Sequence, residues 1–252
     1  QLSGWIWDIG LPSRRGIGHV YSSSYTDATS AEKELRHHIK NLVGEEIAEQ
    51  VSTRKIEFSP GHLEKFWHKN CVAIGMAAGF IEPLEASALV LVELSANMIA
   101  EQLPQNRKIM DIVSKRFNEK FLYRWDTIIE FLKLHYILTD RDNSEYWRDN
   151  VSHESIPASL QEKMDLWKWQ GPYHKDTLHI DEMFPSASYQ YILYGMGFKT
   201  NPGKFRRSNQ ETSAVALDLF DENAMRTKQL VSSMPTNRDF IAKLNQYGLQ
   251  KI

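Results

Sequence analysis

Hydrophobic and polar residues change their spacing part of the way along the chain. Before about residue 80, apolar residues fall in short stretches, and Trp5, Trp7 and Ile9 alternate with other residues. Alternation of this kind predicts strands. Beyond residue 80 the apolar positions recur every three or four residues, which predicts helices. The chain is therefore expected to be α+β, with a mixed part over 1–80 and a mostly helical part over 81–252.

In the first part, two strands over 4–10 and 19–22 are predicted, with residues 14–18 as a hairpin-like loop. Thr26 and Asp27 are suitable N-caps for a helix that ends near Gly44. A short helix or loop is expected next. Further strands are predicted over 54–58 and 71–75.

In the second part, Pro83 suits the first turn of a helix. No repeat or low-complexity linker separates the two parts. The predicted helices cover residues 83–100, 109–136, 159–167, 188–194, 214–231 and 238–247.

Composition excludes several classes of function. Of 252 residues, 42% are hydrophobic and 25% charged, and the net charge of −2 gives no basic surface for nucleic acid. No apolar run is long enough to span a membrane, so we expect no membrane partner. Cys71 is the one cysteine, which fits a reducing, cytoplasmic location. His62 and His68 have no acidic partner at ligand spacing, so no metal site is expected.

The stretch 75–87 reads as a glycine-rich turn that becomes a helix carrying Glu82 and Glu85. Helix N-termini present unpaired N–H groups and favour anions, including a halide or the polar edge of a flavin. Taken alone, these residues favour another interpretation, a purely structural one. Acidic residues are common in any first helical turn, and small residues permit tight packing.

Two motifs together resemble the flavin-dependent halogenases, the tryptophan halogenase family. They are Gly4-Trp5-Ile6-Trp7-Asp8-Ile9-Gly10 and the stretch 75–87. Residues 131–136, 145–148 and 191–198 also resemble the family's C-terminal half. No Gly-x-Gly-x-x-Gly opens the chain, so the resemblance is to that half alone. It implies the end of an FAD-dependent monooxygenase-like α/β flavin domain, here residues 1–80, followed by a helical part that covers the substrate site.

The resemblance also implies roles for single residues. Glu85 matches the family's catalytic carboxylate, which works near the substrate opposite a lysine of the N-terminal half. The backbone of Ser87 and Ala88 matches the halide-binding pair. Trp5 and Trp7 match the tryptophans beside the flavin, although Gly10 replaces the family's usual proline. Further flavin-proximal positions are Gly75, Met76, Pro83, Leu84 and Leu89.

The predicted substrate pocket differs from that of the enzymes that act on free tryptophan. Those enzymes carry a Phe-Trp pair and an earlier Glu, where this chain has Met183 and Phe184, with His179 near the Glu position. Phe184 can stack on an aromatic ring, but no group for an ammonium is evident. We therefore expect an indole or another small aromatic, or a carrier-bound one, and not free tryptophan.

The resemblance predicts an FAD-dependent halogenase that uses reduced FAD, O2 and chloride or bromide on an electron-rich aromatic. A separate flavin reductase would supply the reduced FAD, and an isolated half is expected to be inactive. Two alternatives stay open. One is a flavin-dependent aromatic hydroxylase on the same scaffold, and the other is a non-catalytic helical interaction module.

Overall fold

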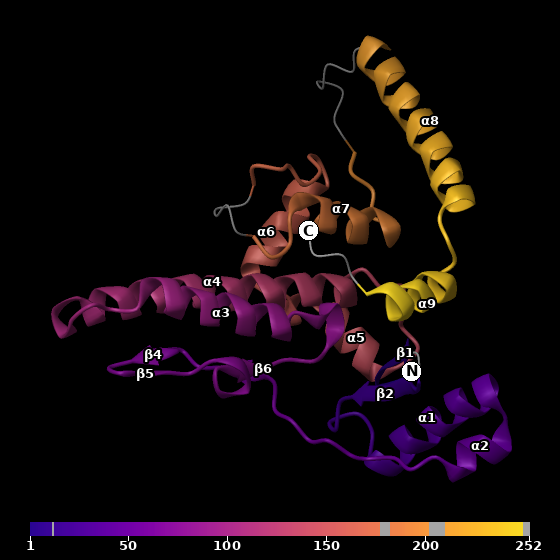
Figure 1. The fold of residues 1–252 in the computed structure, drawn as a ribbon, viewed down its shortest axis with the longest axis horizontal. Helices are drawn as coiled ribbons and strands as arrows, with labels where there is room; N and C mark the ends of the chain where they lie inside the picture. The colour runs from indigo at the N-terminus through magenta and orange to yellow at the C-terminus, as the bar shows by residue number, and fades with distance from the viewer. Residues whose placement is uncertain (12, 177–181, 202–209, 249–252) are drawn as a thin grey trace. The chain divides into compact units, whose positions relative to one another are not determined.

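The computed structural model of the protein describes residues 1–11, 13–176, 182–201 and 210–248. Internal contacts divide the chain into two compact units, residues 1–201 and 202–252. The first unit carries the strands and the helices up to α7, and the second carries α8 and α9 (Figure 1). Among the described residues, every strand lies before residue 81, as the spacing of apolar residues predicts.

The first unit opens with an antiparallel hairpin of β1 (Gly4–Gly10) and β2 (Arg15–Tyr21). The connecting loop is shorter than predicted, because Gly16 and Gly18 pair with Ile9 and Trp7 and so belong to β2. The ring of Trp7 lies against Gly18. A Cβ atom at Gly18 would come within 2.3 Å of that ring.

Helix α1 (Ala28–Val43) follows the hairpin and confirms the predicted caps. The Asp27 carboxylate accepts a hydrogen bond from the N–H of Ser30 at 2.9 Å, and Gly44 ends the helix with φ 90°. The short α2 (Glu45–Gln50) comes next. The strand predicted over 54–58 is wrong, because residues 51–60 are exposed and pair with no strand of the described chain. A lone strand has no partner for its backbone groups.

Two small ladders follow, β3 (Gly61–His62) with β6 (Gly79–Phe80) and β4 (Trp67–His68) with β5 (Cys71–Val72). The predicted strand over 71–75 therefore ends early. The chain instead turns into the 3-10 helix η1 (Gly75–Ala77), where Gly75 has φ 59°. A buried amide from α4 completes this region, since Asn118 Oδ1 accepts from the Trp67 N–H and its Nδ2 donates to the Trp67 carbonyl.

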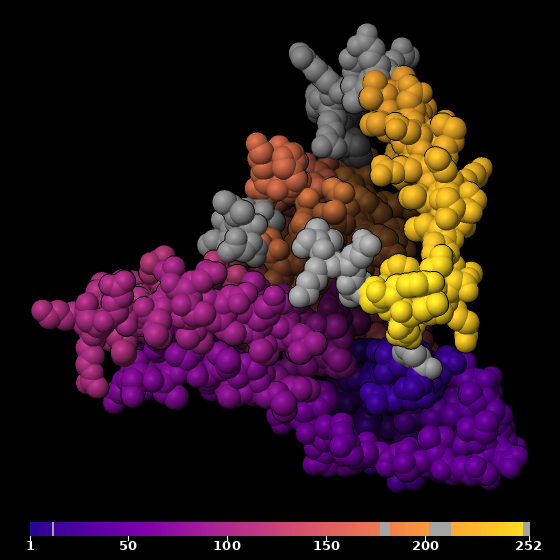
Figure 2. Space-filling model, viewed as in Figure 1, coloured from indigo at the N-terminus to yellow at the C-terminus, as the bar shows by residue number. Residues whose placement is uncertain are grey.

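Helix α4 (Arg107–Ile137) is the axis of the unit and is about 46 Å long at 1.5 Å per residue. Helices α3, α5, α6 and α7 contact it. In Figure 2 the side chains of α3 and α4 form one continuous layer. Elements of the unit not yet given bounds are η2 (Leu84–Ala86), α3 (Ala88–Gln102), α5 (Glu145–Val151), η3 (His153–Ser155), α6 (Ala158–Trp167) and α7 (Ser186–Gly195).

The core follows one face of α4. Phe117, Ile128, Phe131 and Leu134 are almost fully buried and recur at helical spacing. Their partners come from the small ladders and from α3, α6 and α7. The predicted helix over 109–136 is thereby confirmed, as are the helices predicted for α6 and α7.

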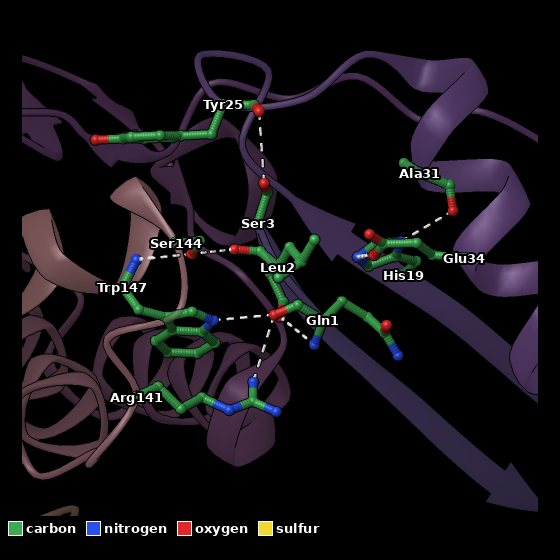
Figure 3. A network of polar contacts seen from close by, with 11 residues as sticks. Gln1, Leu2, Ser3, His19, Tyr25, Ala31, Glu34, Arg141, Ser144 and Trp147 are labelled. Atoms are coloured by element: carbon green, nitrogen blue, oxygen red, sulfur yellow. Dashed lines mark hydrogen bonds and ion pairs between the residues drawn. The ribbon is translucent and has the colours of Figure 1, made fainter.

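The hairpin is tied to the connection between α4 and α5 (Figure 3). Trp147 Nε1 donates to the Gln1 carbonyl at 2.9 Å, and Ser144 Oγ donates to the Leu2 carbonyl at 2.5 Å. These bonds fix the start of β1 beside the end of α4.

The second unit consists of α8 (Gln210–Ser233) and α9 (Asn237–Tyr247), as predicted for residues 214–231 and 238–247. Thr236 caps α9 by accepting from the Asp239 N–H. None of the helices described in either unit is long and apolar enough to cross a membrane.

Candidate active site

The backbone turns sharply between Glu82 and α3. Glu85 has φ 64° and Ala86 has φ 50°, two consecutive non-glycine residues in the left-handed region. Each such residue costs roughly 1–3 kcal/mol, and strain of this kind clusters at functional sites. The helix predicted from Pro83 is therefore wrong at its start. Pro83 precedes the 3-10 turn η2, and α3 begins only at Ala88.

The His135 ring connects the Glu85 side chain to the end of α4. Its Nε2 lies 3.0 Å from Glu85 Oε1, and its Nδ1 lies 2.8 Å from the Phe131 carbonyl oxygen. A carbonyl oxygen only accepts, so Nδ1 carries a hydrogen. The His135 side chain is 16% exposed and that of Glu85 34%, which leaves the carboxylate open to a ligand.

The neighbouring residue of α4, Tyr136, holds the other carboxylate. Its Oη donates to Glu82 Oε1 at 2.6 Å and accepts from Trp5 Nε1 at 3.0 Å. Burial raises the pKa of Glu82, while the Tyr136 hydroxyl and the His135 charge oppose that shift. Burial and the nearby Glu82 charge raise the pKa of Tyr136, which keeps its hydroxyl a donor. The chain of bonds joins β1, α4 and the turn.

Ser87, the residue before α3, is 4% exposed, and its Oγ has no hydrogen-bond partner. The Oγ does not cap the helix. The N–H groups in the first turn of α3 also lack an intrahelical acceptor, and the positive end of the helix dipole lies there. Ser87 and Ala88 thus bring a buried hydroxyl next to a helix N-terminus. This arrangement suits a small anion.

An apolar cavity of about 180 Å³ lies beside the turn. It brings together four of the residues implied by the family resemblance, Gly75, Met76, Ala88 and Leu89. Met76 is 81% exposed and Leu89 80%.

The remaining predicted flavin-side residues, Trp5, Trp7, Pro83 and Leu84, do not line this cavity. Leu84 packs against the cluster of Tyr136, Tyr146 and Trp147, as Trp5 does. Leu84 also packs against the main core, so it lies between that cluster and the core.

The two residues predicted for the substrate pocket pack behind His135. Phe184 stacks on Phe131 with ring centroids 3.9 Å apart, and Phe131 meets His135 edge-on at 5.1 Å. Phe184 is only 8% exposed, and Met183 packs against the same core. His179 lies outside the described residues.

Sequence reasoning missed the roles of His135 and Tyr136. Both fall in the stretch 131–136 that resembles the family, but helical spacing alone shows only which face is buried. Their adjacency at the end of α4 was the available signal. Among the described residues, no group of three or more His, Cys, Asp or Glu side chains is arranged to hold a metal ion.

Comparisons with known proteins show the family of the chain. The tryptophan halogenase family model matches residues 1–210. Tryptophan 6-halogenase SttH of Streptomyces toxytricini is 30% identical over 247 residues, which are 97% of this chain and 45% of that protein. A crystal structure of tryptophan halogenase from Shewanella frigidimarina NCIMB 400 has a TM-score of 0.93 at 46% identity, over 100% of this chain and 47% of that chain.

A second solved structure, BrvH, a flavin-dependent halogenase from Brevundimonas sp. BAL3, has a TM-score of 0.82 at 30% identity, over 97% of this chain and 47% of that one. The chain thus spans about half the length of the relatives it matches. Its mixture of strands and helices fits the C-terminal part of their fold. Because the family match covers most of the chain and the solved structures share its fold, the chain belongs to the tryptophan halogenase family of flavin-dependent enzymes.

Proposed function

We propose that this chain is the substrate-side half of a flavin-dependent halogenase that acts on an electron-rich aromatic ring. Glu85 carries the proposal. It is held in a left-handed turn, bonded to His135 and partly open, beside the buried Ser87 hydroxyl. A carboxylate in such a position can accept the proton that the ring loses after halogen addition.

The halide, chloride or bromide, is proposed to bind at Ser87 and Ala88. The unpartnered Ser87 Oγ is a buried donor with no acceptor of its own, and buried polar groups normally have one. The N–H groups at the start of α3 supply further donors together with the helix dipole. The side chain of Ala88 takes no part in such binding, so alanine in place of the family's frequent glycine is compatible with it.

The cofactor is proposed to be FAD, reduced by a separate flavin reductase. When bound, reduced FAD would supply, together with O2, the oxidising power needed to convert halide into a halogenating agent. The residues present fit a flat ring system, since the exposed Met76 and Leu89 border an apolar cavity and Gly75 adds no side chain there. Residues 1–80 would then belong to a flavin-binding module, and residues 81–252 would cover the substrate site.

The tryptophans of β1 are proposed to separate the flavin from the organic substrate. Trp5 is fixed by its bond to Tyr136. The Trp7 ring is seated against Gly16 and Gly18, which leave room for it. Both rings therefore have a defined orientation and can keep the flavin and the organic substrate apart.

The substrate is proposed to be an indole or a similar aromatic without an amino-acid group. The relatives named above include enzymes whose names specify tryptophan. In this chain, however, the Glu182 carboxylate beside Met183 accepts a hydrogen bond from the Tyr123 hydroxyl. One oxygen of that carboxylate is thus already hydrogen-bonded within the unit.

The test uses the full-length reading frame that contains this chain. The purified protein is supplied with FAD, a flavin reductase, NADH, bromide and indole in air, and products are followed by mass spectrometry. We expect a product with the paired isotope pattern of bromine that disappears without bromide or without reductase. Hydroxylated indole as the main product would contradict the proposal and favour the aromatic hydroxylase.

A further inference from the structure

We propose that His135 is a positioning residue for Glu85. Its Nε2–H donates to Glu85 Oε1 and leaves Oε2 free for the reacting aromatic. This inference rests on the proposed function, because it gives the carboxylate its catalytic task. The bond joins residues 50 positions apart and ties the strained turn to the end of α4.

The orientation of the His135 ring is set by the helix itself. Nδ1 donates to the carbonyl of Phe131, one turn earlier, at 2.8 Å. Phe131 also lies edge-on against the ring, with the two planes at 87°. With one nitrogen bonded and one edge packed, the ring presents Nε2 to the turn in a single direction.

The hydrogens on the two ring nitrogens of His135 decide how the ring meets Glu85. Nδ1–H is used by the Phe131 carbonyl, so a neutral ring would turn a bare Nε2 toward a carboxylate, and two acceptors would repel each other. We infer that a proton lies between Nε2 and Glu85 Oε1 and joins the two side chains. Glu82 lies near enough for the His135 charge to act on it, and its carboxylate is held by Tyr136.

Glu85 needs such a partner because its own position is open. Its side chain is about one-third exposed, has three rotatable bonds and begins at a left-handed residue. A reacting carboxylate displaced by about 1 Å can lose roughly 100-fold in rate. His135 therefore acts through Glu85, and its effect should vanish when Glu85 can no longer react.

The kinetic test compares four variants of the full-length protein with bromide and indole. For His135→Leu we expect a 10- to 100-fold fall in kcat with little change in the KM of indole, as roughly expected for lost positioning. The variant His135→Gln retains an N–H donor and should recover most of the loss. In a Glu85→Gln background, His135→Leu should change the residual rate less than twofold. The control His37→Leu alters an exposed histidine of α1 and should leave kcat unchanged.

An unchanged kcat in His135→Leu would overturn the inference, and so would additive effects of His135→Leu and Glu85→Gln. Neither result affects the proposed function as long as the wild type brominates indole. A second readout is independent of activity. In protein with ¹⁵N-labelled histidine, NMR should show a proton on His135 Nε2 that is hydrogen-bonded to Glu85, and Glu85→Gln should shift the Nε2 resonance. A bare Nε2 in the wild type, or no response to Glu85→Gln, would overturn the inference whether or not the protein halogenates.

Discussion

At the scale of single residues, two carboxylates of one turn have different surroundings. Glu85 faces an imidazole and is partly open, whereas Glu82 is largely buried and bonded to a phenol. Enzymes separate the roles of neighbouring carboxylates by such differences in environment. Glu85 suits proton transfer, and Glu82 suits a fixed structural bond between the turn, Tyr136 and Trp5.

Replacing Glu85 by Gln should therefore abolish halogenation but not flavin oxidation. A Gln side chain keeps the size of Glu and cannot accept the ring proton, so we expect kcat for aromatic bromination to fall about 100-fold or more. Oxygen consumption by reduced flavin should continue, since Glu85 takes no part in it. Mass spectrometry of products together with an oxygen electrode measures both. Glu93→Gln, at an exposed position of α3, is the control. Bromination at an undiminished rate in Glu85→Gln would remove Glu85 from the site.

Glu82 should make the stability of the fold depend on pH. Its pKa is raised in the folded protein, so as pH rises above about 4.5 the unfolded chain ionises first and stability falls until the folded group ionises too. Glu82→Gln removes this cost and can still accept from Tyr136. The variant should gain unfolding free energy relative to wild type as the pH rises above about 4.5, by about 1.4 kcal/mol per unit of pKa elevation. Urea unfolding at a series of pH values tests this. For the control Glu93→Gln, the difference in unfolding free energy from wild type should not change with pH.

At the scale of elements, the helices were predictable and the short strands were not. The apolar face of α4 repeats over many turns, so its extent follows from spacing alone. Residues 54–58 alternate like a strand, but a strand forms only where a partner lies beside it, and spacing in one segment cannot show that. The candidate site, too, was predictable only in part. The role of Glu85 was predicted from the family resemblance, whereas its contact with His135 depends on the packing of α4 beside the turn.

The hairpin offers a matched pair of glycines. A methyl group at Gly18 would come 2.3 Å from the Trp7 ring, while one at Gly10 would meet nothing within 4 Å. Gly18→Ala should therefore destabilise the first unit by about 1–3 kcal/mol through forced displacement of the ring, and Gly10→Ala should not. Denaturant unfolding followed by tryptophan fluorescence measures the effect. Equal stability of the two variants would show that the Trp7 ring is not seated on β2.

At the scale of the whole molecule, the unit contributes a packed aromatic core beside the proposed substrate site. Phe184 is buried on Phe131 behind His135, and the neighbouring Glu182 is bonded to Tyr123. Phe184 carries no group that binds an ammonium, and one oxygen of the Glu182 carboxylate is already hydrogen-bonded.

The full-length protein should accordingly prefer indole to free tryptophan, by at least about tenfold in kcat/KM, since an unpaired ammonium loses a charged hydrogen bond. Competition between indole and L-tryptophan for limiting bromide measures the ratio directly. Tryptamine and indole-3-propionate separate the cost of the ammonium from that of the carboxylate, and tryptamine is expected to be the poorer of the two. Efficient bromination of L-tryptophan would instead require a carboxylate to reach its ammonium. It would show that the bond between Glu182 and Tyr123 opens when substrate binds.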